Sequence, residues 1–291
     1  MARPTKVDGL RARTSVRKAA LRLIAARLAD VRRYERPLSD RVSPEAIHDM
    51  RVAAHRLRVA LMLFGGRGAA KLERKVKQLQ DELGEIRDLQ VQLGWLEKQK
   101  SLEDLEGIRV LLAQQRATLL EKERLLHFAL EDWAVKNAPR FERRLGRLGS
   151  KGSLGGKRMQ RELKGWLDQV KRRLRAMEKS WSPQVIHKFR IQIKRLRYVA
   201  ELLEDGLDKP AAAILETVAP VQKQVGDLHD SDVRLSLLAE FSQTAKSPWR
   251  QHIQMVSQRV ANDRRRQLSK LRGLVRRWDR GGVLRRLTKS I

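Results

Sequence analysis

Two segments of this chain, 139 residues apart, have closely similar sequences. Residues 43–64 read SPEAIHDMRVAAHRLRVALMLF and residues 182–203 read SPQVIHKFRIQIKRLRYVAELL, with nine of 22 positions identical. A second set of matches follows at an offset of 142, pairing Gln80, Gly84, Asp88, Val91 and Leu93 with Gln222, Gly226, Asp230, Val233 and Leu235. Two matches in the same order predict an internal duplication. Two helical bundles related by a pseudo-two-fold axis would follow from it.

Apolar residues recur at three- and four-residue spacing along most of the chain, a pattern that predicts an all-α fold. We expect helices at 14–35, 43–64, 70–83, 87–99, 103–136, 157–180, 183–205, 210–226, 231–243 and 248–278. Ser43-Pro44 and Ser182-Pro183 are typical of an N-cap followed by proline in the first helical turn. The glycine- and serine-rich run at 149–156 predicts a flexible linker between repeat 1 at 10–148 and repeat 2 at 157–280.

Each copy of the repeated helix carries a row of basic residues opposite its apolar face. At about 100° per residue, the basic and apolar side chains separate onto opposite sides of each helix. The first stripe consists of His48, Arg51, His55 and Arg58, and the second stripe consists of His187, Arg190, Lys194 and Arg197. Arg56 and Arg195 flank the stripes. We expect both stripes to be almost purely cationic.

The spacing of each stripe suits a linear phosphate ligand. Positions i, i+3, i+7 and i+10 of a helix span roughly 15 Å along one axis. Arginine can bind two phosphate oxygens with its planar fork, lysine supplies a point charge, and protonated histidine donates two hydrogen bonds. The pattern therefore predicts a track for several consecutive phosphates. If the pseudo-two-fold axis brings the stripes together, they line one shared groove.

The net charge also favours an anionic partner. Lys and Arg number 64 against 34 Asp and Glu, which gives a formal charge of +30. Such an excess attracts nucleic acid, polyphosphate or an anionic membrane surface. No run of 18 apolar residues and no signal-peptide pattern is visible, so we expect no membrane insertion. The absence of cysteine excludes disulfides and thiolate zinc sites, and fits a reducing cytoplasm.

The duplicated Asp88 and Asp230 indicate a further role beside the stripes. We expect each to be a helix N-cap or to orient an arginine of a stripe, and the alternative is a magnesium ligand. Gly84 and Gly226 are expected to mark a helix break or a close helix contact. No Ser-His-Asp pattern, Walker loop or suitably spaced carboxylate pair is visible. The sequence therefore predicts no catalytic activity, no cofactor and no resident metal.

The two repeated segments resemble the signature helices of the CHAD domain family, the conserved histidine α-helical domain. LGEIRDLQV and VGDLHDSDV resemble the element that follows them in that family. The resemblance covers residues 10–280, without a CYTH domain, and implies one domain of two antiparallel four-helix bundles around a basic central cavity. It further implies binding of inorganic polyphosphate and association with polyphosphate granules. The chain departs from the family at His55, where Arg or Lys is usual. It also departs at His229, which aligns with Arg87 of the first repeat.

The expectation is therefore a non-catalytic polyphosphate-binding protein of the cytoplasm, located at granules or regulating phosphate metabolism. The eight residues of the two stripes would contact the ligand. Two alternatives stay open. Nucleic acid fits the net charge equally well and would compete for the same surface. A metal-dependent phosphohydrolase would use Asp88 and Asp230. The sequence does not fix the oligomeric state.

Overall fold

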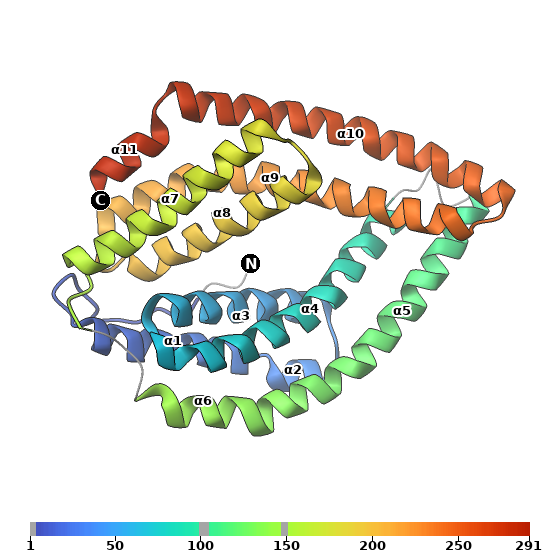
Figure 1. Ribbon diagram of the computed structural model, residues 1–291. Helices are drawn as coiled ribbons and strands as arrows, with labels where there is room; N and C mark the ends of the chain where they lie inside the picture. The colour runs from blue at the N-terminus through green and yellow to red at the C-terminus, as the bar shows by residue number, and fades with distance from the viewer. Residues whose placement is uncertain (1–3, 99–104, 147–150) are drawn as a thin grey trace. The chain divides into compact units, whose positions relative to one another are not determined.

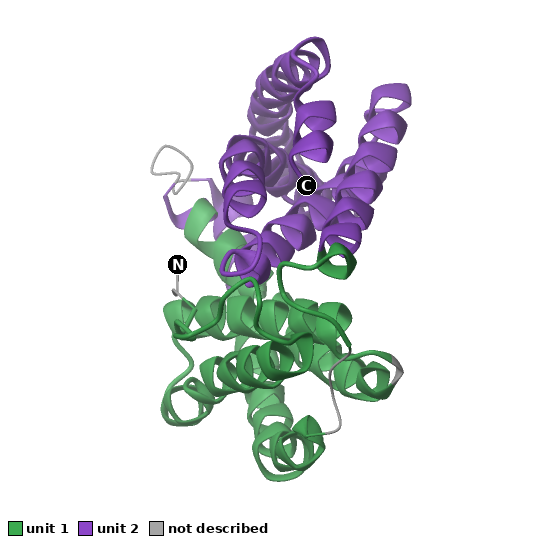
Figure 2. Cartoon of the chain, turned by 90° about the vertical axis from the view of Figure 1, so that its left-hand side faces the viewer, with its two compact units in different colours: residues 1–95, 114–159 green, residues 96–113, 160–291 purple. Residues whose placement is uncertain are grey.

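The chain folds as an all-α protein, as the sequence predicts (Figure 1). A computed structural model describes residues 4–98, 105–146 and 151–291, and these residues form helices and loops without any β-strand. None of the described helices has the length and hydropathy that a membrane span requires. The chain divides into two compact units, residues 1–95 with 114–159 and residues 96–113 with 160–291 (Figure 2). They are called unit 1 and unit 2 below.

Unit 1 is built around the first copy of the repeated helix. Its elements are α1 (Val16–Arg32), α2 (Glu35–Asp40), α3 (Pro44–Phe64), the 3-10 turn η1 (Arg67–Ala69), most of α4 (Ala70–Glu97), the second part of α5 (Glu106–Glu131), the π-helical turn η3 (Asp132–Asn137) and α6 (Ala138–Leu145). Helices α1 and α3 pack along each other. Met50, Leu57 and Phe64 of α3 are fully buried, and each such side chain contributes about 1.5–3 kcal/mol by leaving water.

Unit 2 is built around the second copy. Its elements are the end of α4, the beginning of α5, α7 (Lys157–Lys179), α8 (Pro183–Leu203), α9 (Asp208–Thr244), α10 (Ser247–Arg280) and α11 (Val283–Ser290). Helix α8 packs along α9, and α9 packs along α10. Phe189, Ile193 and Leu196 form the fully buried face of α8. The apolar face predicted for this helix is therefore confirmed.

Helices α3 and α8 begin with the same cap, and each is 21 residues long. The hydroxyl of Ser43 accepts a hydrogen bond from the amide of Ala46 at 3.1 Å. The hydroxyl of Ser182 accepts one from the amide of Val185 at 3.4 Å. A proline occupies the first turn of each helix, where it loses no hydrogen bond. The predicted capping of both helices is confirmed.

Removing either cap should destabilise the protein by a similar amount. Ser43→Ala and Ser182→Ala each leave helix amides without their acceptor, at a cost of about 1 kcal/mol. Urea denaturation followed by circular dichroism measures this loss. Ser269→Ala, at an exposed position inside α10, is the control and should have little effect. Cap variants as stable as the control would contradict the assigned roles.

Several predicted helix boundaries are wrong. Helices 70–83 and 87–99 are one continuous helix, α4, and helices 210–226 and 231–243 both belong to α9. Gly84 and Gly226 therefore lie inside helices and mark no break. An interior glycine costs about 1 kcal/mol relative to alanine, and packing of buried neighbours such as Leu83 and Val225 offsets that cost. The sequence also did not predict the short helices α2 and α11.

Part of the predicted linker is held in place. Residues 149–150 lie outside the described residues, but part of 151–156 is hydrogen-bonded to residues 12–16 at the beginning of α1. Val16 donates to the carbonyl of Gly152 at 2.8 Å, and Leu154 donates to that of Thr14 at 2.8 Å. The side chain of Leu154 is fully buried. This portion is thus hydrogen-bonded to unit 1. The linker role of 149–156 and the repeat boundaries 10–148 and 157–280 stay predictions.

Candidate functional site

The first stripe lies along a half-buried edge of α3. Most of the circumference of this helix is buried, and the stripe is part of the polar surface that remains. Its four residues are all half-buried: His48, Arg51, His55 and Arg58. Arg56, predicted to flank the stripe, is only 5% exposed and lies in the buried part of the helix. Its guanidinium is therefore not displayed to solvent as a flanking contact would require.

Residues of helix α4 lie beside this edge of α3. Arg87 donates a hydrogen bond to the carbonyl of Pro44 at 3.4 Å, which holds it at the N-terminal end of α3 near His48. One turn further along α3, a Cβ atom added to Gly84 would lie 3.5 Å from Nε of Arg51, an ordinary van der Waals distance. At Gly226, a Cβ atom would have no described neighbour within 4 Å. The predicted close helix contact is therefore not what requires a glycine at either position. At the C-terminal end of the stripe, Arg58 forms an ion pair with Glu73.

The environment of His48 favours its neutral form. Burial is the largest cause that lowers its pKa below the ordinary histidine value. The positive charges of Arg87 and Arg51 lower the pKa further, while the carboxylate of Asp49 acts in the opposite direction. An anion placed among these cations would reverse the balance and stabilise the protonated ring. Occupancy by an anion and protonation of His48 are therefore coupled.

The second stripe has the same organisation on α8 in unit 2. His187, Arg190, Lys194 and Arg197 are all half-buried. Helix α9 again supplies a neighbour, because the ring of His229 lies 5.0 Å from the ring of His187, measured between centroids. At the other end, Arg197 Nε forms an ion pair with Glu201 at 3.1 Å. Arg195, the predicted flanking residue, is half-buried.

The two stripes therefore depart from the predicted, almost purely cationic rows in the same way. The last arginine of each is paired with a carboxylate, Arg58 with Glu73 and Arg197 with Glu201. Helices α4 and α9 add one basic residue each at the opposite end. We call the first basic cluster His48, Arg51, His55 and Arg87, and the second basic cluster His187, Arg190, Lys194 and His229.

The duplicated aspartates are not N-caps. Asp88 lies inside α4 and is exposed, and Asp230 lies inside α9. The charge of Asp230 raises the pKa of Arg234 one turn away, against the larger effect of burial, which lowers it. Asp230 therefore acts electrostatically on Arg234, a residue outside both stripes. An orienting role toward the stripes stays a prediction for both aspartates.

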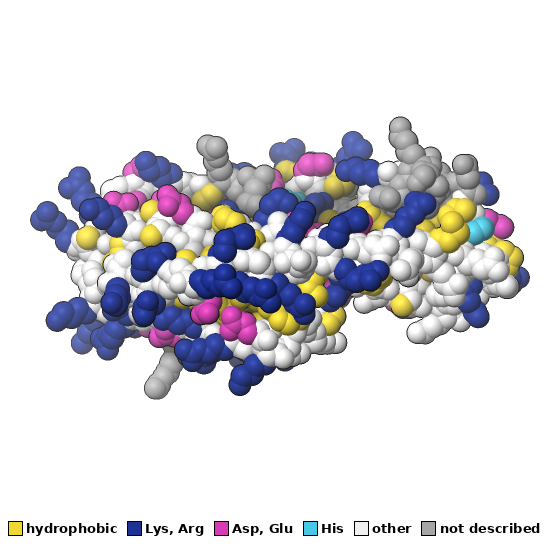
Figure 3. All heavy atoms as spheres, turned by 90° about the horizontal axis from the view of Figure 1, so that it is seen from above, with side chains coloured by type: hydrophobic (Ala, Val, Ile, Leu, Met, Phe, Trp, Pro, Cys, Tyr) yellow, Lys and Arg dark blue, Asp and Glu magenta, His cyan; other side chains and the backbone are white. Residues whose placement is uncertain are grey.

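Charge elsewhere on the molecule does not single out a site. Basic side chains recur over the whole face seen in Figure 3, with acidic side chains among them. In the densest basic run, Arg264 pairs with Asp232 and Arg266 pairs with Asp263. Among the residues that the structure describes, no group of three or more His, Cys, Asp or Glu could hold a metal ion. What distinguishes the two basic clusters is their half-burial and their matching positions.

Comparisons with known proteins agree with this fold. The family model of the CHAD domain matches residues 22–239, more than half of the chain. The crystal structure of the CHAD domain from the plant Ricinus communis is similar with a TM-score of 0.73 and 23% identity, covering 94% of this chain and 96% of that chain. PptA from Streptomyces chartreusis is similar with a TM-score of 0.62 and 13% identity, covering 91% and 99%. None of the curated proteins compared with the chain matches it.

Proposed function

The chain belongs to the CHAD domain family, and from this premise we propose that it binds inorganic polyphosphate without cleaving it. The observation that carries the proposal is the presence of two half-buried basic clusters at matching positions of two helical units. Each cluster combines arginine or lysine with two histidines. These are the side chains that recognise phosphate oxygens through charge-assisted hydrogen bonds.

The clusters would bind phosphate by replacing its counterions. Arg51, Arg87 and Arg190 can each bind two oxygens of one phosphate group. Half-burial strengthens these contacts, because charges interact more strongly away from bulk water. The stripe geometry extends along a helix axis, which favours a linear chain over a single phosphate. The expected groove shared by both stripes stays a prediction. Affinity that rises with chain length and then levels off would support it.

A competition experiment separates this function from nucleic-acid binding. Polyphosphates of defined length are titrated against labelled RNA and DNA at one fixed ionic strength. Long polyphosphate should displace bound RNA or DNA at a lower phosphate concentration than RNA or DNA needs to displace bound polyphosphate. If nucleic acid instead displaces polyphosphate at the lower concentration, the proposal is contradicted and a nucleic-acid partner is favoured. Magnesium-dependent release of phosphate, lost in Asp88→Ala, would instead support the phosphohydrolase.

Binding should become stronger as the pH falls. The pKa of His48 is lowered by burial and by Arg87 and Arg51, so its ring is mostly neutral at neutral pH. Bound phosphate favours the protonated ring, so the complex holds more protons than the separate partners. Affinity should therefore rise several-fold between about pH 8 and about pH 6. Isothermal titration calorimetry at several pH values measures this affinity. Long polyphosphate chains are used because they have few terminal phosphates, whose own protonation would otherwise add to the pH dependence.

The matched control for this pH effect is His48→Gln, which keeps a hydrogen-bond donor but cannot titrate. Its affinity should change less with pH than that of the parent protein. The remaining slope would come from His55, His187 and His229. Identical pH profiles for the variant and the parent would exclude His48 as a contributor. An affinity that rises with pH would contradict the proposed anion contact.

We place this binding activity in the cytoplasm, at polyphosphate granules or in the regulation of phosphate metabolism. A fluorescent fusion of the full chain should collect at granules if it is targeted to them. The variant with Arg51→Glu and Arg190→Glu should remain diffuse. Equal granule recruitment of both proteins would mean that the basic clusters do not direct the location.

A further inference from the structure

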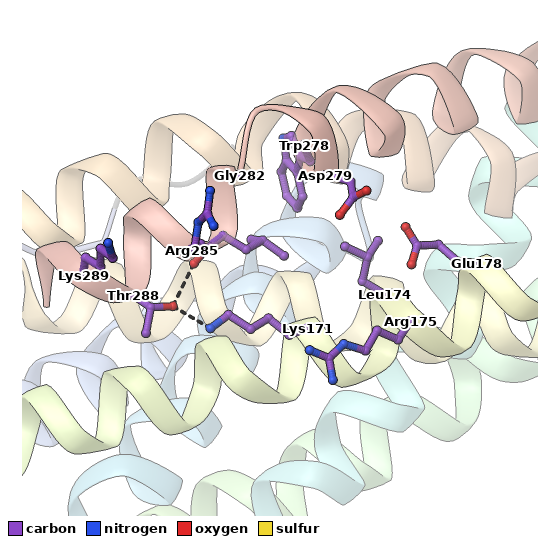
Figure 4. Close-up of a pocket in the computed structure, with 11 residues that line it drawn as sticks. Lys171, Leu174, Arg175, Glu178, Trp278, Asp279, Gly282, Arg285, Thr288 and Lys289 are labelled. Carbon is purple, nitrogen blue, oxygen red and sulfur yellow. Dashed lines mark hydrogen bonds between the residues drawn. The ribbon is translucent and has the colours of Figure 1, made fainter.

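Unit 2 contains a pocket whose lining residues were not singled out from the sequence. It has a volume of about 480 Å³ and lies among α7, the end of α10 and α11 (Figure 4). None of its lining residues belongs to either basic cluster. The volume falls within the range of roughly 300–1,000 Å³ that is typical of small-molecule sites.

The turn between α10 and α11 builds one wall of this pocket. Gly282 has a φ of +56°, a left-handed conformation that side chains disfavour. A Cβ atom there would also lie 3.2 Å from the guanidinium of Arg285. Glycine thus lets the chain turn sharply into α11 while Arg285 lies close to the turn. Helix α7 then faces α11 across the pocket.

A hydrogen-bonded lysine ties the two walls together. Lys171 of α7 donates to the hydroxyl of Thr288 in α11 at 2.6 Å and pairs with Asp168 at 3.0 Å. The hydroxyl of Thr288 in turn donates to the carbonyl of Leu284 at 2.7 Å. The walls formed by α7 and α11 are therefore joined by contacts within the protein. These contacts hold the basic residues of both helices beside the pocket before any ligand binds.

The pocket has two electrically different ends. In Figure 4, Lys171, Arg285 and Lys289 lie toward one end, whereas the carboxylates of Glu178 and Asp279 lie toward the other. A further lining cation, Arg175, stands on α7 between Lys171 and Glu178. Leu174 and Trp278 give the space between the two ends an apolar surface, and both are largely buried. A matching ligand has an anionic end, a flat apolar middle and hydrogen-bond donors at its far end.

We propose that this pocket binds a nucleoside phosphate whose base carries an exocyclic amino group. The phosphates would lie against Lys171, Arg285 and Lys289, which offer charge-assisted hydrogen bonds. The base would pack against Leu174 and Trp278, and its amino group would donate to Glu178 or Asp279. A bare polyphosphate chain has no part that suits the apolar surface, and the two carboxylates repel it. The pocket is thus a second site with a ligand class different from that of the basic clusters.

Isothermal titration calorimetry with three probes tests the ligand class. The probes are ATP, inosine triphosphate and inorganic tripolyphosphate, used with the full chain at one ionic strength. ATP should bind about tenfold or more tightly than inosine triphosphate, whose base presents a carbonyl where ATP presents the amino group, because that carbonyl faces a carboxylate. Equal affinity for all three probes would overturn the proposal, and so would the absence of saturable ATP binding.

Variants then locate the site. Arg285→Glu with Lys289→Glu should weaken ATP binding about tenfold or more, and Asp279→Asn with Glu178→Gln should reduce the preference for ATP over inosine triphosphate. The control Arg140→Glu, exposed in unit 1, should leave ATP binding unchanged. Arg51→Glu with Arg190→Glu should also leave it unchanged, whatever its effect on polyphosphate. Loss of ATP binding in that last variant, with the pocket variants unaffected, would place the nucleotide at the basic clusters and refute the pocket.

Discussion

Replacing Arg51 and Arg190 by glutamate in the same protein is expected to weaken polyphosphate binding by about 10²-fold or more. Each arginine lies in the middle of one basic cluster and is half-buried. A hydrogen bond to a charged group contributes about 1.5–3 kcal/mol, and two are removed. The new carboxylates also repel phosphate. Fluorescence anisotropy with a labelled long-chain polyphosphate measures the change.

The matched control reverses two exposed arginines, one in each unit, outside the clusters. Arg140→Glu with Arg276→Glu changes the net charge equally and should lose little affinity. Circular dichroism should show the same helicity for both variants. Arg51→Gln with Arg190→Gln, which introduces no negative charge, should fall between the parent and the reversal variant. A reversal variant that binds as tightly as the control would refute the assignment of both clusters.

Salt should weaken the complex steeply. If four to six phosphates are neutralised, the logarithm of the binding constant should fall with the logarithm of salt concentration with a slope of about −3 to −4, taking about 0.7 per phosphate as for single strands. Affinity should then fall roughly 10²-fold between about 50 mM and about 200 mM salt. The cause is the release of counterions from the ligand when the clusters replace them. Anisotropy titrations at several potassium chloride concentrations give the slope.

The slope should become shallower when cluster residues are removed. Arg51→Gln with Arg190→Gln takes away two phosphate contacts and should reduce the magnitude of the slope by about 1.4. The control Arg140→Gln with Arg276→Gln should keep the slope of the parent protein. A salt-independent affinity would contradict binding by charge neutralisation. An equal reduction in both variants would mean that total charge, rather than the clusters, sets the binding.

The sequence predicted the parts of the fold that depend on local chemistry. Ser43-Pro44 and Ser182-Pro183 begin helices because serine accepts a helix amide and proline tolerates the first turn. The apolar faces of α3 and α8 followed from helical periodicity. The continuity of α4 through Gly84 could not be predicted in this way, because packing within unit 1 outweighs the local cost of a glycine.

The candidate site was predicted only in part. Glu201 stands four residues after Arg197 and could have been recognised as its helical ion-pair partner. Glu73 is 15 residues from Arg58, and only the packing of α3 against α4 brings the two together. The same packing places Arg87 near His48. Arg87 and His229 occupy equivalent positions of the two repeats, and His229 likewise lies near His187. That equivalence in the sequence could have indicated that both residues belong to the site. The pocket beside α11 was not predicted, because it depends on a turn at Gly282 that periodicity does not reveal.

A crystal structure of the protein with a polyphosphate of defined length would show where the ligand binds. We expect a row of phosphates that contacts Arg51 and Arg190, with His48 and His187 within hydrogen-bond distance of phosphate oxygens. Phosphates bound instead along the basic run at Arg264–Arg266 of α10, with both basic clusters unoccupied, would contradict this expectation.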